Sequence, residues 1–137
     1  MAIKRVYNLK KDSYDARDYQ FMSRHLNVFL PENVDNRHYF SEVRDQGDLG
    51  SCTAFSTVCG AYEMLHIKQL LNSYPINESP DLNNIQTSPL FQYQNTLILE
   101  NSFGTDNGAE IRTAIKAMNK FGVCNEKSWP YNTDKFD

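Results

Sequence analysis

Apolar residues repeat at helical spacing along one stretch in the middle of the chain. From Ala54 onward they recur every three or four positions, as on one face of an α-helix. Ser51 precedes the pattern and is a residue type that caps helix starts. The sequence therefore predicts a helix from Ser51 to about Leu71, with Glu63 and Lys68 on its solvated side. Its core face would be formed by Phe55, Val58, Tyr62 and Leu65.

Two more helices are predicted after a surface loop at 72–87 that is rich in turn-forming residues. Ser88-Pro89 supplies an N-cap and a proline at the first helical position, so a second helix should run from there to about Asn101. A third helix should follow the turn at Asn107-Gly108 and end at Gly122. The buried residues expected on these two helices are Leu90, Tyr93 and Leu97, then Ile111, Ala114, Ile115 and Met118.

The remaining segments show neither a helical nor a strand period. Residues 1–29 are polar and interrupted by charges, and we interpret them as an extended arm that lies on another part of the protein. Residues 30–44 are expected to be irregular, and residues 123–137 show no clear period. The last few residues carry neither a helix stop nor a capped strand, which favours a cut over a natural terminus.

Composition and charge exclude several classes of function. The 137 residues carry 14 Lys+Arg and 17 Asp+Glu, a net charge of -3, without a basic stripe for nucleic acid. No stretch approaches the roughly 20 apolar residues of a membrane-spanning helix, and the N-terminus lacks a secretory signal. Three cysteines do not make a disulfide framework. We therefore expect a cytoplasmic or otherwise intracellular protein with reduced thiols, which binds neither nucleic acid nor membrane.

The loop at 45–50 and the residues after it carry the chemistry. Cys52 would lie in the first turn of a helix, where the unpaired N–H groups and the positive end of the dipole favour the nucleophilic thiolate. Gln46 lies six residues earlier, across a glycine-containing loop that can fold its amide back toward the thiol. The amide and the Cys52 backbone N–H would form a two-donor oxyanion hole for acyl transfer.

This stretch resembles the active-site signature of the papain-like cysteine peptidases. Three other segments are similar to the family's in the right order: residues 30–37, Asn107-Gly108-Ala109, and the region from Lys120 to Tyr131. The resemblance covers about residues 30–132. The positions that match the signature itself are Gln46, Gly47, Gly50, Ser51, Cys52, Ala54, Phe55 and Ser56.

Three departures from the family pattern alter the surroundings of the thiol. Leu49 stands where secreted members have a disulfide cysteine, which agrees with a reducing compartment. Thr53 replaces the tryptophan that follows the nucleophile. Ala109 replaces a glycine whose backbone binds substrate, so its methyl group would reshape the subsites. The resemblance still implies that Gly108 and Ala109 contact substrate through their backbone.

The chain lacks an obvious general base for a cysteine nucleophile. The family's His and Asn lie roughly 130–150 residues after the Cys, beyond residue 137. Of the three histidines, His66 would be about 21 Å along the helix from Cys52, while His25 and His38 precede the loop. Cys59 and His66 are about 10.5 Å apart along a helix, too far to share a metal ion. We expect no metal and no cofactor.

The resemblance implies an α+β papain-like fold, of which this chain holds the mainly helical left domain (30–137) behind a leader or inhibitory prosegment (1–29). The right β-barrel domain, with the base, would lie beyond this chain and be its partner. The implied function is peptide-bond hydrolysis through a thioester, acting on peptides or proteins, in a short-prosegment zymogen of the intracellular bacterial or viral type. Association with a virion stays open. The alternative is a non-catalytic, peptidase-derived structural or interaction module, and this chain alone is expected to be inactive.

Overall fold

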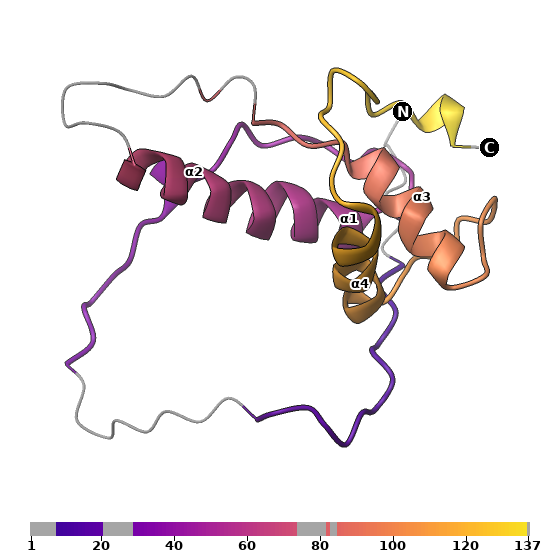
Figure 1. Cartoon of the computed structure of the whole chain (residues 1–137), viewed down its shortest axis with the longest axis horizontal. Helices are drawn as coiled ribbons and strands as arrows, with labels where there is room; N and C mark the ends of the chain where they lie inside the picture. The colour runs from indigo at the N-terminus through magenta and orange to yellow at the C-terminus, as the bar shows by residue number, and fades with distance from the viewer. Residues whose placement is uncertain (1–7, 21–28, 74–81, 83–84, 137) are drawn as a thin grey trace.

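The computed structural model describes residues 8–20, 29–73, 82 and 85–136. In Figure 1 one long helical rod runs from Cys52 to Ser73, and α3 and α4 pack near its N-terminal end. No strand is present among the described residues, apart from two isolated bridges. The described part is thus helical, as expected for a left domain. Its elements are η1 (Arg37–Tyr39), α1 (Cys52–Ala54), η2 (Phe55–Tyr62), α2 (Glu63–Ser73), α3 (Pro89–Leu99), α4 (Ile111–Phe121) and η4 (Thr133–Lys135).

The rod is continuous from Cys52 to Ser73, but its middle segment, η2, is a π-helix. A π-helix has more residues per turn than an α-helix, so the residues after it face a different side than α-helical spacing predicts. The prediction that Glu63 is solvated is therefore wrong, because its side chain is fully buried. The prediction that Leu65 is buried is also wrong, because it is 60% exposed.

Helix α3 forms as predicted and ends at Leu99, slightly earlier than expected. The Ser88 hydroxyl accepts a hydrogen bond from Phe91 N at 3.1 Å, which caps the helix start. Helix α3 contributes three of the buried residues at the centre of the core. The core also includes residues of the loop at 45–50 (the nucleophile loop), of α1 and of the C-terminal tail. The core cluster consists of Leu49, Ala54, Leu90, Tyr93, Leu97, Ala109 and Phe136.

Helix α4 packs on α3 through small residues. Ala114 and Ala117 are fully buried, and the Gln92 side-chain amide donates to Ala114 O at 2.8 Å. The prediction that Ile111 is buried is wrong, since it is 38% exposed. The prediction that Ile115 is buried is wrong as well, since it is 56% exposed. It lines a shallow pocket beside Asp12 of the N-terminal segment, so this apolar side chain faces the arm rather than α3. The helix ends at Gly122, at φ 75°, as predicted.

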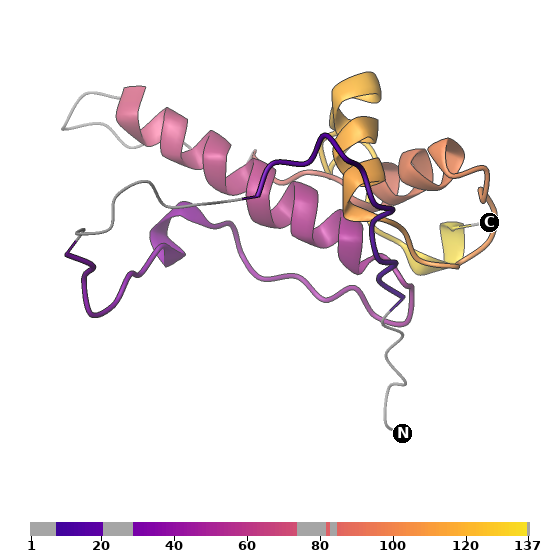
Figure 2. The same ribbon diagram turned by 90° about the horizontal axis from the view of Figure 1, so that it is seen from below.

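The N-terminal segment crosses the start of α4, and Figure 2 shows it passing over that helix. Asp12 accepts from Arg112 N at 3.0 Å, and Asp18 forms a bidentate ion pair with the Arg112 guanidinium at 2.5 and 2.8 Å. Lys10 pairs with Glu100 at 3.0 Å. The described part of the arm is therefore bound to the helical domain largely by charged groups.

A buried polar network joins the segment before the nucleophile loop to the rod. Glu63 accepts from Arg44 at 2.6 Å, from Thr87 N at 2.7 Å, from the Thr87 hydroxyl at 2.6 Å and from the Ser41 hydroxyl. Arg44 also donates to Thr87 O at 2.8 Å. This network holds residues 41–44 against η2 and α2. Most of the predicted loop at 72–87 lies outside the described residues, and no described helix is long and apolar enough to span a bilayer.

Candidate active site

Cys52 is the first residue of α1 and follows directly from the predicted loop. Its side chain is half-buried, whereas Leu49, Gly50 and Ser51 before it are buried. The first N–H groups of a helix have no acceptor within the helix. Cys52 therefore combines access from outside with proximity to backbone donors that can stabilise negative charge.

The Tyr131 hydroxyl closes the loop that leads to Cys52. It donates to Gln46 O at 2.8 Å and lies 2.7 Å from the Ser51 hydroxyl. The prediction that the Ser51 side chain caps the helix is wrong, because its hydroxyl pairs with Tyr131 instead. Burial raises the pKa of Tyr131 to about 12, so the hydroxyl stays protonated as a donor. The Tyr131 ring also makes an edge contact with Phe55 at 4.9 Å between centroids.

The Gln46 side chain lies within the same loop. Its Nε2 donates to Leu49 O at 2.9 Å, which fixes the orientation of the amide. Gln46 and Cys52 thus belong to one short segment. Tyr131 connects its start, at Gln46 O, with the Ser51 hydroxyl directly before Cys52.

Gly108 and Ala109 are buried beneath the N-terminal segment. Lys10 N donates to Ala109 O at 3.2 Å, and Lys10 forms a parallel bridge with Glu110. Gly108 has φ 69°, and a Cβ placed on it would lie 1.6 Å from Asn8 O. The backbone of the arm therefore lies directly on the edge that the sequence predicts for substrate.

Two residues that the sequence reasoning missed connect this edge with the nucleophile loop. The Asp106 carboxylate accepts from Gly50 N at 3.0 Å through both oxygens and from the Tyr93 hydroxyl at 2.6 Å. The Tyr93 hydroxyl accepts from Gly108 N at 3.0 Å. Asp106 directly precedes the predicted Asn-Gly turn, but no local pattern indicates what its side chain contacts.

Thr53, at the position of the family's tryptophan, also connects the two segments. It is buried, and its hydroxyl donates to Ala109 O at 3.0 Å. The same carbonyl accepts from Lys10 N of the arm. The substitution therefore places a hydrogen-bond donor between α1 and the predicted substrate edge.

The other cysteines lie in different surroundings from Cys52. Cys59 Sγ is 2.8 Å from the Arg44 guanidinium, and burial raises its pKa to about 12. A thiol with that pKa is almost entirely protonated at neutral pH, so Cys59 is a poor nucleophile. Cys124 Sγ lies 3.5 Å from Asn125 O. Within the described ranges, no group of three or more His, Cys, Asp or Glu residues is placed to hold a metal ion.

Sequence comparisons show which known proteins this chain is similar to. The sequence profile of the papain family cysteine proteases matches residues 30–136. An uncharacterized peptidase C1-like protein of Acanthamoeba polyphaga mimivirus is 46% identical over 96 residues, covering 70% of this chain and 27% of that protein. A cathepsin L-like proteinase of Fasciola hepatica is 31% identical over 109 residues, covering 77% of this chain and 28% of that protein.

A solved structure shows the same arrangement of the chain. The crystal structure of xylellain, a cysteine protease from Xylella fastidiosa, superposes with a TM-score of 0.70 at 35% identity. The match covers 92% of this chain and 43% of xylellain. The chain thus spans less than a third of its two curated relatives and less than half of the solved structure. It belongs to the papain family of cysteine proteases and corresponds to the family's mainly helical left domain.

Proposed function

We propose that this chain carries the nucleophile half of a cysteine peptidase, with Cys52 as the nucleophile. The Cys52 thiolate attacks the carbonyl carbon of a peptide bond, and the amine leaves with a proton from the base. The resulting thioester is then hydrolysed by water, which frees the thiol. The Cys52 N–H and the Gln46 amide stabilise the oxyanion of each tetrahedral intermediate.

The observation that carries this proposal is the position of Cys52. It is a half-buried thiol at the start of a helical rod that continues to Ser73, and its loop contains a glutamine amide. Cys59, on the same rod, is held in its protonated form by burial, which suits a structural thiol and not a nucleophile.

The test is hydrolysis of fluorogenic peptides by the full-length protein. Cys52→Ala should abolish turnover, and Gln46→Ala should lower kcat by roughly 100- to 1000-fold, the usual effect of removing one oxyanion donor. Asp48→Ala, an exposed residue in the same loop, is the matched control and should leave kcat nearly unchanged. Turnover that survives Cys52→Ala, or its absence from the full-length protein even after residues 1–29 are removed, would support the non-catalytic interaction module instead.

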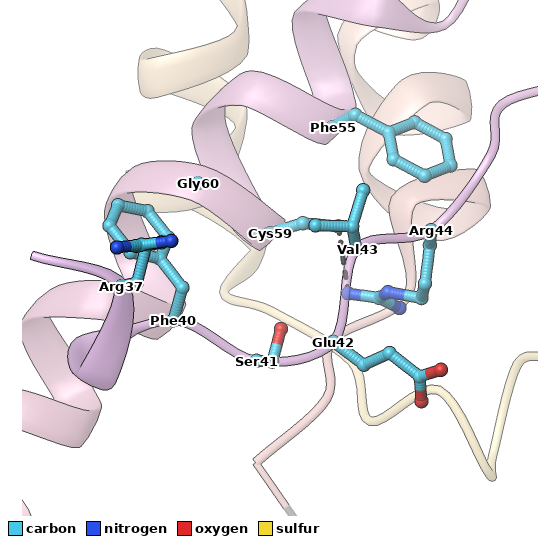
Figure 3. A pocket seen from close by; sticks show the side chains of 9 residues that line it. All are labelled: Arg37, Phe40, Ser41, Glu42, Val43, Arg44, Phe55, Cys59 and Gly60. Atoms are coloured by element: carbon cyan, nitrogen blue, oxygen red, sulfur yellow. Dashed lines mark hydrogen bonds between the residues drawn. The ribbon is translucent and has the colours of Figure 1, made fainter.

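We also propose that the base is supplied by a second domain that covers the segment from Phe29 to Arg44. Several large apolar side chains of this segment are exposed, including Val43 at 95% and Val34 at 70%. A pocket of about 480 Å³ lies between this segment and η2. Figure 3 shows its lining side chains, of which Phe40, Val43 and Phe55 contribute apolar surface. An exposed apolar surface of this kind is typical of a surface that binds another protein or domain.

The covering domain can be tested by placing a charge on this surface. Val43→Asp should lower the melting temperature of the full-length protein, because a charge would be buried between the two domains. Tyr14→Asp in the arm, at a residue that is 92% exposed, is the matched control and should not change it. An unchanged melting temperature for both variants would mean that this surface is open in the full-length protein.

We further propose that residues 1–29 inhibit the enzyme by occupying the edge that substrate uses. The support is the hydrogen bond from Lys10 N to Ala109 O and the contact of Asn8 with Gly108. Deleting the arm should raise peptidase activity, and Arg112→Ala should raise it partially, because the ion pair with Asp18 is lost. Added salt should act in the same direction, since exposed ion pairs are screened.

The control for the arm is Lys120→Ala, which removes an exposed charge from the last turn of the same helix. It should leave activity unchanged. Equal activity with and without residues 1–29, under conditions in which Cys52→Ala is inactive, would show that the arm does not inhibit.

A further inference from the structure

Asp106 lies where the nucleophile loop and the predicted substrate edge meet. Its two carboxylate oxygens share the N–H of Gly50, two residues before Cys52, at 3.0 Å each. Gly50 is buried, and a Cβ placed on it would lie 2.8 Å from the Asp106 carboxylate. The close approach of the carboxylate to the loop backbone therefore requires glycine at position 50.

Tyr93 extends this contact to the second segment. Its side chain is fully buried at the centre of the core, stacked on Phe136 at 5.6 Å. Its hydroxyl donates to Asp106 at 2.6 Å and accepts from Gly108 N at 3.0 Å. Burial, together with the hydrogen bond to Asp106, raises the pKa of Tyr93, so the hydroxyl remains a neutral donor.

We propose that Asp106 and Tyr93 are positioning residues that hold the Cys52 loop and the Gly108 edge at a fixed separation. The Asp106 carboxylate fixes the loop through Gly50, and the Tyr93 hydroxyl fixes the edge through Gly108. This inference rests on the proposed function, because the separation matters when a substrate bound along Gly108 presents its carbonyl carbon to Cys52. Small displacements of a reacting group cost large factors in rate.

The two residues act on different halves of the site, which gives different expected effects. Asp106→Ala frees the Cys52 loop and should lower kcat/KM by roughly 10- to 100-fold. Tyr93→Phe leaves Asp106 bonded to Gly50 but removes the partner of Gly108 N, so it should mainly raise KM, by about three- to tenfold. Asp106→Asn should retain activity within about threefold, because the one oxygen that already accepts from both donors is kept.

Two alkylating reagents separate these effects in the full-length protein from which residues 1–29 have been removed, so that the Gly108 edge is open. Iodoacetamide is small and reports the reactivity of Cys52 alone, whereas an epoxysuccinyl peptide also needs the Gly108 edge. Asp106→Ala should slow both reactions at Cys52, and Tyr93→Phe should slow only the peptide reagent. Thr96→Val is the control, because it removes another buried hydroxyl from α3 that bonds within the helix. It should slow neither reagent.

Hydrogen exchange tests the positioning contacts without relying on activity. The Gly50 amide should exchange at least about tenfold faster in Asp106→Ala, and the Gly108 amide faster in Tyr93→Phe. The inference would be overturned if exchange at these amides were unchanged. It would also be overturned if Tyr93→Phe had the same effect on the two reagents as Thr96→Val. If Asp106→Ala does not fold, the results for Tyr93→Phe and Asp106→Asn decide whether the inference holds. A wild-type protein without peptidase turnover after removal of residues 1–29 would refute the proposed function, and the exchange result would still decide on the contacts.

Discussion

Replacing Glu63 by glutamine should destabilise the fold strongly. Glu63 is fully buried and accepts hydrogen bonds from Arg44, Ser41 and two groups of Thr87. Glutamine has nearly the same shape but no charge, and one of its oxygens becomes an amide that cannot accept. The substitution therefore removes the nearer charged partner of the Arg44 guanidinium, which is 17% exposed, at 2.6 Å, and leaves the longer ion pair with Glu126 at 3.5 Å.

The expected loss follows from these contacts. Breaking a buried ion pair by removing one partner usually costs about 3–5 kcal/mol. Two features reduce the loss here, because glutamine keeps one acceptor for Thr87 and Arg44 keeps its bonds to Thr87 O and Cys59. We expect Glu63→Gln to lower the free energy of unfolding by about 2–4 kcal/mol.

The assay is urea denaturation of the full-length protein, followed by circular dichroism. The matched control is Asp134→Asn, a carboxylate-to-amide change at an exposed residue outside the segment from Phe29 to Arg44, with an expected effect within about 0.5 kcal/mol. Combining Arg44→Met with Glu63→Gln should cost at least about 1 kcal/mol less than the sum of the two single effects. Additive effects, or a Glu63→Gln variant as stable as the wild type, would refute the reasoning.

Three other predictions concern the site. Burial raises the pKa of Cys59 to about 12, so its thiolate fraction near pH 8 is about 1 in 10,000. Iodoacetamide should therefore alkylate Cys59 ~1000-fold more slowly than an ordinary thiol. Fast labelling of Cys59 in peptide mapping would contradict this. Tyr131→Phe removes the donor to Gln46 O and should lower kcat/KM about tenfold, and an unchanged value would exclude a role in closing the loop. Gly108→Ala places a methyl group against Asn8, so the arm should be cut faster by an added protease; an unchanged cleavage rate would contradict the contact.

Signals confined to a few neighbouring residues predicted the start and end of helices well. Ser88 and Pro89 identified the first turn of α3, and Gly122 identified the end of α4. These signals depend on backbone angles and hydrogen bonds within one turn, so the sequence contains all that is needed. The loop before Cys52 was predicted from equally local information.

The buried sides of the helices were predicted less well. The helical pattern assumed 3.6 residues per turn through the rod, whereas η2 is a π-helix, and this placed Glu63 and Leu65 on the wrong sides. In α4 the pattern placed Ile115 on the buried face and did not include Ala117. Helix α3 lies so close to α4, however, that small side chains fill the contact. Neither the π-helix nor the close helix packing leaves a clear signal in one sequence.

The contacts that hold the site together could not be predicted at all. Asp106 and Gly50 are 56 positions apart in the chain, and Asn8 reaches Asp106 O across 98 positions. Such contacts depend on how α3, α4 and the arm pack, and no spacing rule relates them. The sequence therefore predicted which residues could react, and the structure added the contacts of Asp106 and Tyr93 that connect their segments.

The central claim is that Cys52 is a catalytic nucleophile with a base from outside this chain. It is tested most directly by removing residues 1–29 from the full-length protein, treating it with an epoxysuccinyl peptide and measuring intact mass, with Cys52→Ala as control. We predict one label per protein, located on Cys52 and absent from the control. The claim would be contradicted if the probe left the protein unlabelled while iodoacetamide still alkylated Cys52 slowly, because that thiol would then lack its base.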